Sequence, residues 1–167
     1  METCSPRANE AEDELGTIAI VGLGNQFYGD DGVGPVVAQR LYEILCHKAD
    51  FVLLEPGASG FRLAERLVGY QRVVIIDAFT NSPLEVGTVN RVAILNSPGC
   101  SLLTLHTVGF HDGLALARMV GLEVPRSIVL YGIVIREPGC FSETLSAELT
   151  AKLPQIVEAI AAEQMRQ

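Results

Sequence analysis

The chain has 167 residues, of which 49% are hydrophobic and 19% charged, and its formal net charge is −8. Its length fits one domain, and its apolar fraction excludes disorder of the chain as a whole. The negative charge argues against nucleic acid and anionic membrane surfaces as partners. No run of about 18 apolar residues and no signal-peptide pattern is present, so we expect a soluble, intracellular domain with no membrane-spanning helix.

The first residues differ in composition from the rest. Residues 1–14 contain five acidic side chains, one arginine, no aromatic residue and no apolar period. Such a segment cannot bury enough apolar surface to fold by itself. We therefore expect a disordered acidic tail over residues 1–15 and a single domain over residues 16–167.

Five apolar runs are predicted to be β-strands. Their apolar character is continuous rather than alternating, which is typical of strands covered on both faces of a parallel sheet. The runs are Thr17–Val21, Phe51–Leu54, Arg72–Ile76, Thr88–Leu95 and Ser127–Val134. The connection before the fourth run, residues 85–88, is too short for a crossover helix. That strand is therefore predicted to be antiparallel or to lie at an edge.

Helical patterns separate most of these runs. The first has an apolar face of Val33, Val37, Leu41, Ile44 and Leu45, opposite charged and polar residues. The second has Phe61, Ala64, Leu67 and Val68, with Ser59 placed to cap it. Two more helices are predicted over residues 112–120 and 147–162, and Pro154 is expected to kink the last one or begin its main segment.

The alternation of strands and helices predicts an α/β fold. We expect three layers: a twisted, mostly parallel sheet of about five strands, with helices on both faces. In such sheets, ligands bind outside the carboxyl ends of the strands. The polar residues that follow the strands are therefore the candidate functional residues.

A glycine-rich loop follows the first strand, over residues 22–35. Its Gly22-Leu-Gly24 start suggests dinucleotide binding, because glycines let the backbone approach a pyrophosphate. The third glycine of that fingerprint is replaced by Phe27, and two adjacent carboxylates in the loop would repel phosphate. A nucleotide-binding α/β enzyme is thus an alternative with weak support.

Three ligand-type side chains are expected at the carboxyl edge of the sheet. Asp31 lies in the glycine-rich loop, with Asp30 beside it, and Asp77 closes the third strand. His106 lies in a loop before the next helix, although His111 competes for the same role. Two carboxylates and an imidazole suit a borderline divalent metal such as nickel or zinc. For each residue taken alone, a capping or structural role is the competing interpretation.

The motifs taken together resemble those of the nickel–iron hydrogenase maturation endopeptidases. The resemblance extends from Ile18 to about residue 160, and the order and spacing of its motifs make the combination specific. The matching segments are residues 22–25, 29–34, 55–60, 75–78, 105–109, 130–133 and 145–146.

The resemblance implies a cytoplasmic hydrolase that removes a C-terminal extension from a hydrogenase large-subunit precursor after nickel insertion. It assigns Asp31, Asp77 and His106 as the nickel-contacting residues, with Asp31 and Asp77 as the catalytic carboxylates of an aspartic-type or metal-assisted endopeptidase. Many family members have a glutamate at the position of Asp31. The nickel would be that of the precursor, rather than a permanent cofactor. A precursor-binding chaperone without catalytic activity is a further alternative.

Overall fold

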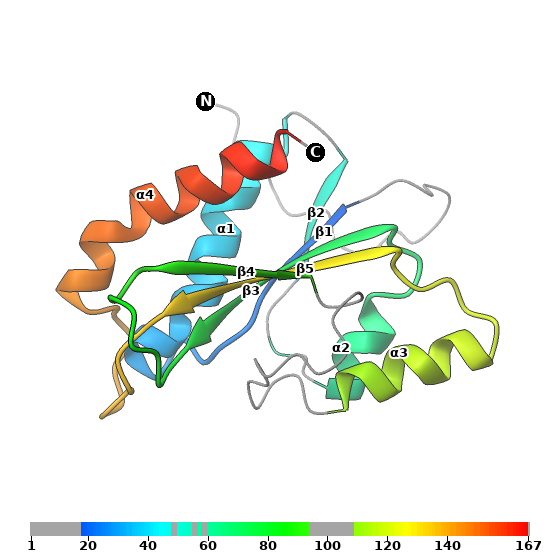
Figure 1. Ribbon diagram of the computed structural model, residues 1–167, viewed down its shortest axis with the longest axis horizontal. Coiled ribbons are helices and arrows are strands. Elements are labelled where there is room, and N and C mark those ends of the chain that lie inside the picture. Colours follow the sequence, from blue (N-terminus) through cyan, green and yellow to red (C-terminus); the bar gives the residue numbers. More distant parts are fainter. Residues whose placement is uncertain (1–17, 48–49, 55–56, 58–59, 94–108, 167) are drawn as a thin grey trace.

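The computed structural model describes residues 18–47, 50–54, 57, 60–93 and 109–166 and has an α/β architecture (Figure 1). The strands are β1 (Ile18–Gly22), β2 (Phe51–Leu54), β3 (Arg72–Phe79), β4 (Val89–Ala93) and β5 (Ser127–Val134). The helices are the 3-10 turn η1 (Gly29–Gly32), α1 (Val33–Leu45), α2 (Gly60–Arg66), α3 (Phe110–Met119) and α4 (Ala147–Gln164). None of these helices is both long and apolar enough to cross a membrane.

The five strands form one sheet in the order β2-β1-β3-β5-β4. The pairs β1–β2, β1–β3 and β3–β5 are parallel, whereas β4 pairs antiparallel with β5 and lies at the edge. The mostly parallel sheet and the reversed edge strand are both as predicted. The short connection after β3 explains the reversal, because it contains no helix to carry the chain back across the sheet.

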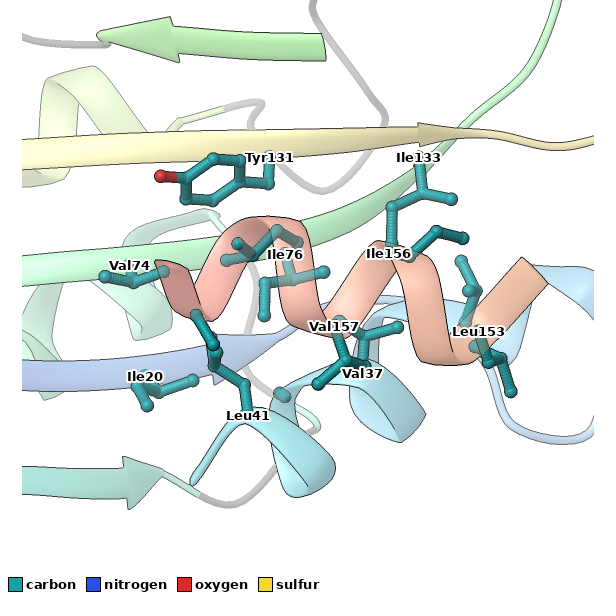
Figure 2. Close-up of a cluster of buried hydrophobic side chains, with 14 of the residues drawn as sticks. Ile20, Val37, Leu41, Val74, Ile76, Tyr131, Ile133, Leu153, Ile156 and Val157 are labelled. Atoms are coloured by element: carbon teal, nitrogen blue, oxygen red, sulfur yellow. The ribbon is translucent and has the colours of Figure 1, made fainter. Parts of the chain in front are cut away.

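Helices α1 and α4 cover one face of the sheet. Their buried side chains pack on alternate residues of the strands, such as Ile20, Val74, Ile76 and Tyr131 (Figure 2). The helix residues in this cluster include Val37, Leu41, Leu153, Ile156 and Val157. Helix α4 continues through Pro154, whose side chain is exposed, so Pro154 does not begin the main segment of the helix as one alternative had it.

Helices α2 and α3 cover the opposite face, so the molecule has the three predicted layers (Figure 1). Their buried residues pack on the other set of strand residues, which includes Val73 and Ile75. The two helices lie very close together, since a Cβ added at Gly113 of α3 would lie 2.7 Å from the Cβ of Ala64 in α2. This packing places the start of α3 beside the carboxyl half of the sheet.

Two predicted core residues were wrong. Ile44 is 41% exposed and Tyr42 is buried in its place, because α4 packs on the side of α1 that Tyr42 occupies. Phe61 is 53% exposed and Leu63 is buried instead. The ring of Phe61 lies over the glycines of α3, where it is half open to solvent. The expected tail and the expected cap, Ser59, lie outside the described residues.

Candidate functional site

Two of the predicted site residues, Asp31 and Asp77, lie after β1 and near the end of β3, the strands between which the winding of the sheet reverses. From β1 the chain passes through α1 to β2 on one side, and from β2 through α2 to β3 on the other side of β1. The carboxyl ends of β1 and β3 are therefore adjacent, with Gly22 paired to Ile76. In open α/β sheets this reversal creates a crevice in which ligands bind.

The glycines after β1 allow backbone segments to pack directly against each other. A Cβ on Gly34 would lie 2.0 Å from the carbonyl oxygen of Leu23 and 2.7 Å from that of Ile76. A Cβ on Gly22 would lie 2.5 Å from the Cα of Pro35. The first turn of α1 thus rests on the ends of β1 and β3, and the glycines serve this close approach.

The side chain of Asp31 forms a hydrogen bond within the glycine-rich loop. Its Oδ2 accepts a hydrogen bond of 2.7 Å from the backbone N–H of Asn25, and the Asn25 side chain accepts one from the N–H of Phe27. A loop amide that a phosphate would need is therefore already bound to a carboxylate. This contact disfavours the nucleotide-binding alternative, because a phosphate would have to displace an anion of the protein.

Asp77 is buried, with 1% of its surface exposed, at the carboxyl end of β3. Its Oδ1 accepts a 2.9 Å hydrogen bond from the N–H of Ala78. Side chains alternate along a strand, so Asp77 faces the same side as Val73 and Ile75, the side covered by α2 and α3. Burial of a carboxylate is costly unless it is hydrogen-bonded or bound to a metal, so this position demands polar surroundings.

The segment Leu23–Asn25 is bound at both ends. The carboxylate of Asp31 accepts a hydrogen bond from the N–H of Asn25, and the carbonyl of Ile76, the residue before Asp77, accepts a 2.7 Å bond from the N–H of Leu23. The glycine-rich loop that contains Asp31 is thus joined to β3 next to Asp77.

The third predicted ligand, His106, lies outside the described residues. Within them, no group of three histidine, cysteine, aspartate or glutamate side chains is placed to hold a metal ion. In the sequence His106 is four residues before α3, whose first residue Phe110 is buried on the face that Asp77 also faces. His111 is exposed on α3, with its ring edge-on to that of Phe110 at 6.0 Å between centroids.

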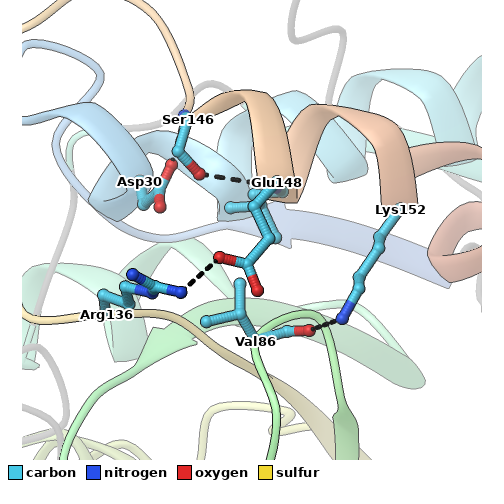
Figure 3. A network of polar contacts seen from close by, with 7 residues as sticks. Asp30, Val86, Arg136, Ser146, Glu148 and Lys152 are labelled. Atoms are coloured by element: carbon cyan, nitrogen blue, oxygen red, sulfur yellow. Dashed lines mark hydrogen bonds and ion pairs between the residues drawn. The ribbon is translucent and has the colours of Figure 1, made fainter.

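Asp30 has a different role from its neighbour. Its Oδ1 accepts a 2.6 Å hydrogen bond from the N–H of Ser146, the residue that caps α4 through a bond from Leu149 N–H to its side chain (Figure 3). The capping interpretation of the aspartate pair is therefore wrong for the helix that follows it: the N-cap of α1 is Gly32, and no side chain caps this helix. Asp30 instead binds the residue that caps α4.

Ion pairs and hydrogen bonds fix the first turns of α4 over the sheet. Arg136, just after β5, pairs with Glu148 at 2.8 Å, and Lys152 Nζ donates a 2.6 Å bond to the carbonyl of Val86 (Figure 3). Asp30 therefore joins its loop to the start of α4, which the contacts of Glu148 and Lys152 also hold in place.

Three aromatic residues beside the site were not identified from the sequence. Phe27 and Phe141 stack with centroids 5.9 Å apart and planes 10° apart, and Tyr28 forms a parallel bridge with Ser142. We call Phe27, Tyr28 and Phe141 the aromatic platform. More than a hundred residues separate its two loops, and no local pattern in the sequence signals that they pair.

Comparison with known proteins gives a consistent result. The family model described as hydrogenase maturation protease matches residues 35–163. The hydrogenase expression/formation protein HupD of Thiocapsa roseopersicina is 29% identical over 144 residues, which is 84% of this chain and 64% of that protein. The chain thus spans less than two thirds of the length of this relative.

Two solved structures have the same fold. The nickel–iron hydrogenase maturation protease HybD from Thermococcus kodakarensis is 29% identical with a TM-score of 0.62, and the match covers 90% of this chain and 99% of that one. The hydrogenase maturating endopeptidase HybD from E. coli gives a TM-score of 0.68 at 21% identity, with 90% and 93% covered.

Proposed function

The chain belongs to the hydrogenase maturation protease family, and we propose on this basis that it is the endopeptidase that removes the C-terminal extension of a nickel–iron hydrogenase large-subunit precursor. In the proposal the enzyme is cytoplasmic and acts after nickel has been inserted. The observation that supports it best is the placement of Asp31 after β1 and of Asp77 near the adjacent end of β3, where Leu23 N–H binds the carbonyl of Ile76 and Asn25 N–H binds Asp31.

Nickel in this proposal belongs to the substrate. Asp31, Asp77 and His106 contact the ion that the precursor already holds, which gives the oxygen and nitrogen donors that a borderline divalent metal accepts. The bond from Asn25 N–H to Oδ2 of Asp31 orients that carboxylate. Recognition of the ion then makes cleavage conditional on a finished metal centre.

The same aspartates are proposed to assist hydrolysis. A water molecule attacks the scissile carbonyl carbon, and a carboxylate takes the proton of that water as general base. The C–N bond then breaks, and the same carboxyl group gives the proton to the leaving amine nitrogen. When nickel is bound, it supplies Lewis-acid polarisation at the reacting carbonyl. The crevice position lets Asp31 approach the peptide from the glycine-rich loop, while Asp77 approaches from β3.

The decisive experiment mixes the purified chain with a nickel-loaded large-subunit precursor. Mass spectrometry should find a shortened precursor and a released peptide, and the nickel-free precursor should remain intact. Cleavage of the nickel-free form at the same rate would contradict recognition of the metal. Stable binding without cleavage would identify the chain as a precursor-binding chaperone instead.

A further inference from the structure

The aromatic platform is an exposed apolar surface next to the proposed site. Phe27 is 54% exposed, Tyr28 43% and Phe141 70%. The chain has six phenylalanines, four tyrosines and no tryptophan, so a substantial share of its aromatic residues lies in this one place. Large exposed aromatic groups are enriched at the centres of protein–protein interfaces, where they contribute much of the binding free energy.

Backbone hydrogen bonds hold the platform in place. The N–H of Gly29 donates a 2.7 Å bond to the carbonyl of Ser142, and the N–H of Ser142 donates a 3.1 Å bond to the carbonyl of Phe27. Gly29 has a φ of 58°, which favours glycine and lets the loop turn toward Ser142. The rings are thus ordered before a partner arrives, which lowers the entropic cost of binding.

The platform shares a loop with the proposed active site. Phe27 and Asp31 are four residues apart in that loop, so their Cα atoms are at most about 14 Å apart. An extended substrate spans that distance with about four residues. A polypeptide with its scissile bond beside Asp31 therefore has its neighbouring residues within reach of the rings.

Charge around the platform defines what it binds. Asp30 and Asp31 follow Tyr28, and exposed Glu143 follows Phe141 by two residues. Two copies of the chain that met through these rings would bring equal carboxylates together, which is unfavourable. A partner that is apolar at the centre and basic at its flank fits the surface better.

We propose that the aromatic platform docks an apolar segment of the large-subunit precursor with a basic residue at its flank, close to the cleavage site. This inference rests on the proposed function and adds a surface that selects the substrate. The platform residues bind the polypeptide and take no part in bond breaking, so their loss should raise KM and leave kcat nearly unchanged.

The test measures steady-state processing of the nickel-loaded precursor by Phe141→Ser and by the double variant Phe27→Ser/Phe141→Ser. We expect KM to rise about tenfold or more in the double variant, with kcat within about twofold of the original. The control is Met119→Ser, because Met119 is 84% exposed on α3, away from the platform loops. Equal KM values for platform and control variants would overturn the inference, provided that melting temperatures show both to be folded.

A charge variant and a binding assay complete the test. Glu143→Lys should also raise KM, and an unchanged KM would contradict the basic flank. Calorimetric titration of each variant with the precursor separates the two proposals. If the original chain binds the precursor but does not cleave it, the proposed function fails. Loss of binding in the platform variants would still support docking in that case. A dimer in sedimentation experiments that dissociates in the platform variants would assign the surface to a second copy and overturn the inference.

Discussion

Asp31 and Asp77 lie in different environments although one follows β1 and the other lies near the end of the adjacent strand β3. Asp31 is partly exposed and binds the amide of Asn25, whereas Asp77 is buried at the end of β3 and binds the amide of Ala78. An asparagine at either position retains an oxygen that can accept the bond from the amide. Replacement of either carboxylate by an amide therefore tests whether the negative charge is needed, with little change in the shape of the side chain.

We predict that Asp31→Asn and Asp77→Asn each lower processing about 100-fold or more, because a neutral amide binds a divalent metal more weakly and is no general base. Melting temperatures should stay close to that of the original chain. Asp50→Asn serves as the control, since Asp50 precedes β2 at the opposite edge of the sheet. Normal processing by Asp31→Asn would remove that residue from the site, and unfolding of Asp77→Asn would show a structural role.

Substitutions of the two histidines should affect processing differently. His106→Ala is expected to lose nickel-dependent processing, whereas His111→Ala should retain most of it, because His111 is exposed on α3. The reverse result, an inactive His111→Ala and an active His106→Ala, would mean that the assignment is in the wrong register.

The connection between the glycine-rich loop and α4 depends on one carboxylate. Asp30→Ala removes the 2.6 Å bond to Ser146 N–H and a negative charge near the start of α4. We expect a loss of about 1–2 kcal/mol in the free energy of unfolding, as for other helix-start carboxylates. Thermal and urea unfolding measure it. The control is Asp112→Ala in the first turn of α3, which should cost less, and equal losses would contradict a specific role for Asp30.

Close contact between α1 and the strand ends should tolerate no side chain at Gly34. Gly34→Ala places a Cβ against two carbonyl oxygens of the backbone, at 2.0 and 2.7 Å, neither of which can rotate away. We expect a loss of about 3 kcal/mol or more, measured by urea unfolding. Gly139→Ala, which has open space around its Cβ, should change stability by less than about 0.5 kcal/mol. A stable Gly34→Ala would contradict the packing described here.

Local patterns were sufficient to predict much of the fold. Continuous apolar runs identified the strands, and the short segment before β4 predicted its reversal and edge position. These predictions succeeded because the covered sheet and the length of a connection are properties of neighbouring residues. Asp77 was expected to close the third strand, whereas it lies inside β3, which continues to Phe79 because these last residues pair with β5.

Contacts between elements that are distant in the sequence could not be predicted from such local patterns. Ile44 and Tyr42 are both compatible with an apolar face of α1, and the position of α4 decides between them. The stacking of Phe27 on Phe141 and the bond from Ser146 to Asp30 join segments more than a hundred residues apart. No local periodicity contains that information, so the aromatic platform and the role of Asp30 required the structure.

A buried polar network joins α4 to the sheet on the face opposite to that of Asp77. Gln164 donates a 2.7 Å bond to the Tyr131 hydroxyl and accepts one from Arg72. Burial, the largest effect, raises the pKa of Tyr131 above its ordinary value. The network thus connects β3, β5 and the end of α4 across the larger hydrophobic cluster.

Because the pKa of Tyr131 is raised in the folded chain, the free energy of unfolding should change with pH in the alkaline range. Above about pH 10 the unfolded chain loses the tyrosine proton while the folded chain keeps it, so the free energy of unfolding falls as pH rises toward the folded pKa. Tyr131→Phe should weaken that fall, and Tyr70, whose pKa burial also raises, accounts for part of the remainder. Urea unfolding at pH 8 and pH 10.5 measures the difference. An unchanged pH dependence in Tyr131→Phe would contradict the prediction.

The bond between Asp30 and Ser146 spans 116 positions of the sequence, and this has a consequence for synthesis. During translation the amino-terminal part of a domain emerges first, and contacts of large sequence separation form late. The loop that contains Asp31 thus gains its final support when the start of α4 leaves the ribosome. A nascent chain that stops before Ser146 contains Asp31 and Asp77 but lacks the partner that supports the loop of Asp31. The proposed activity should therefore arise only after Ser146 and the start of α4 have been synthesised.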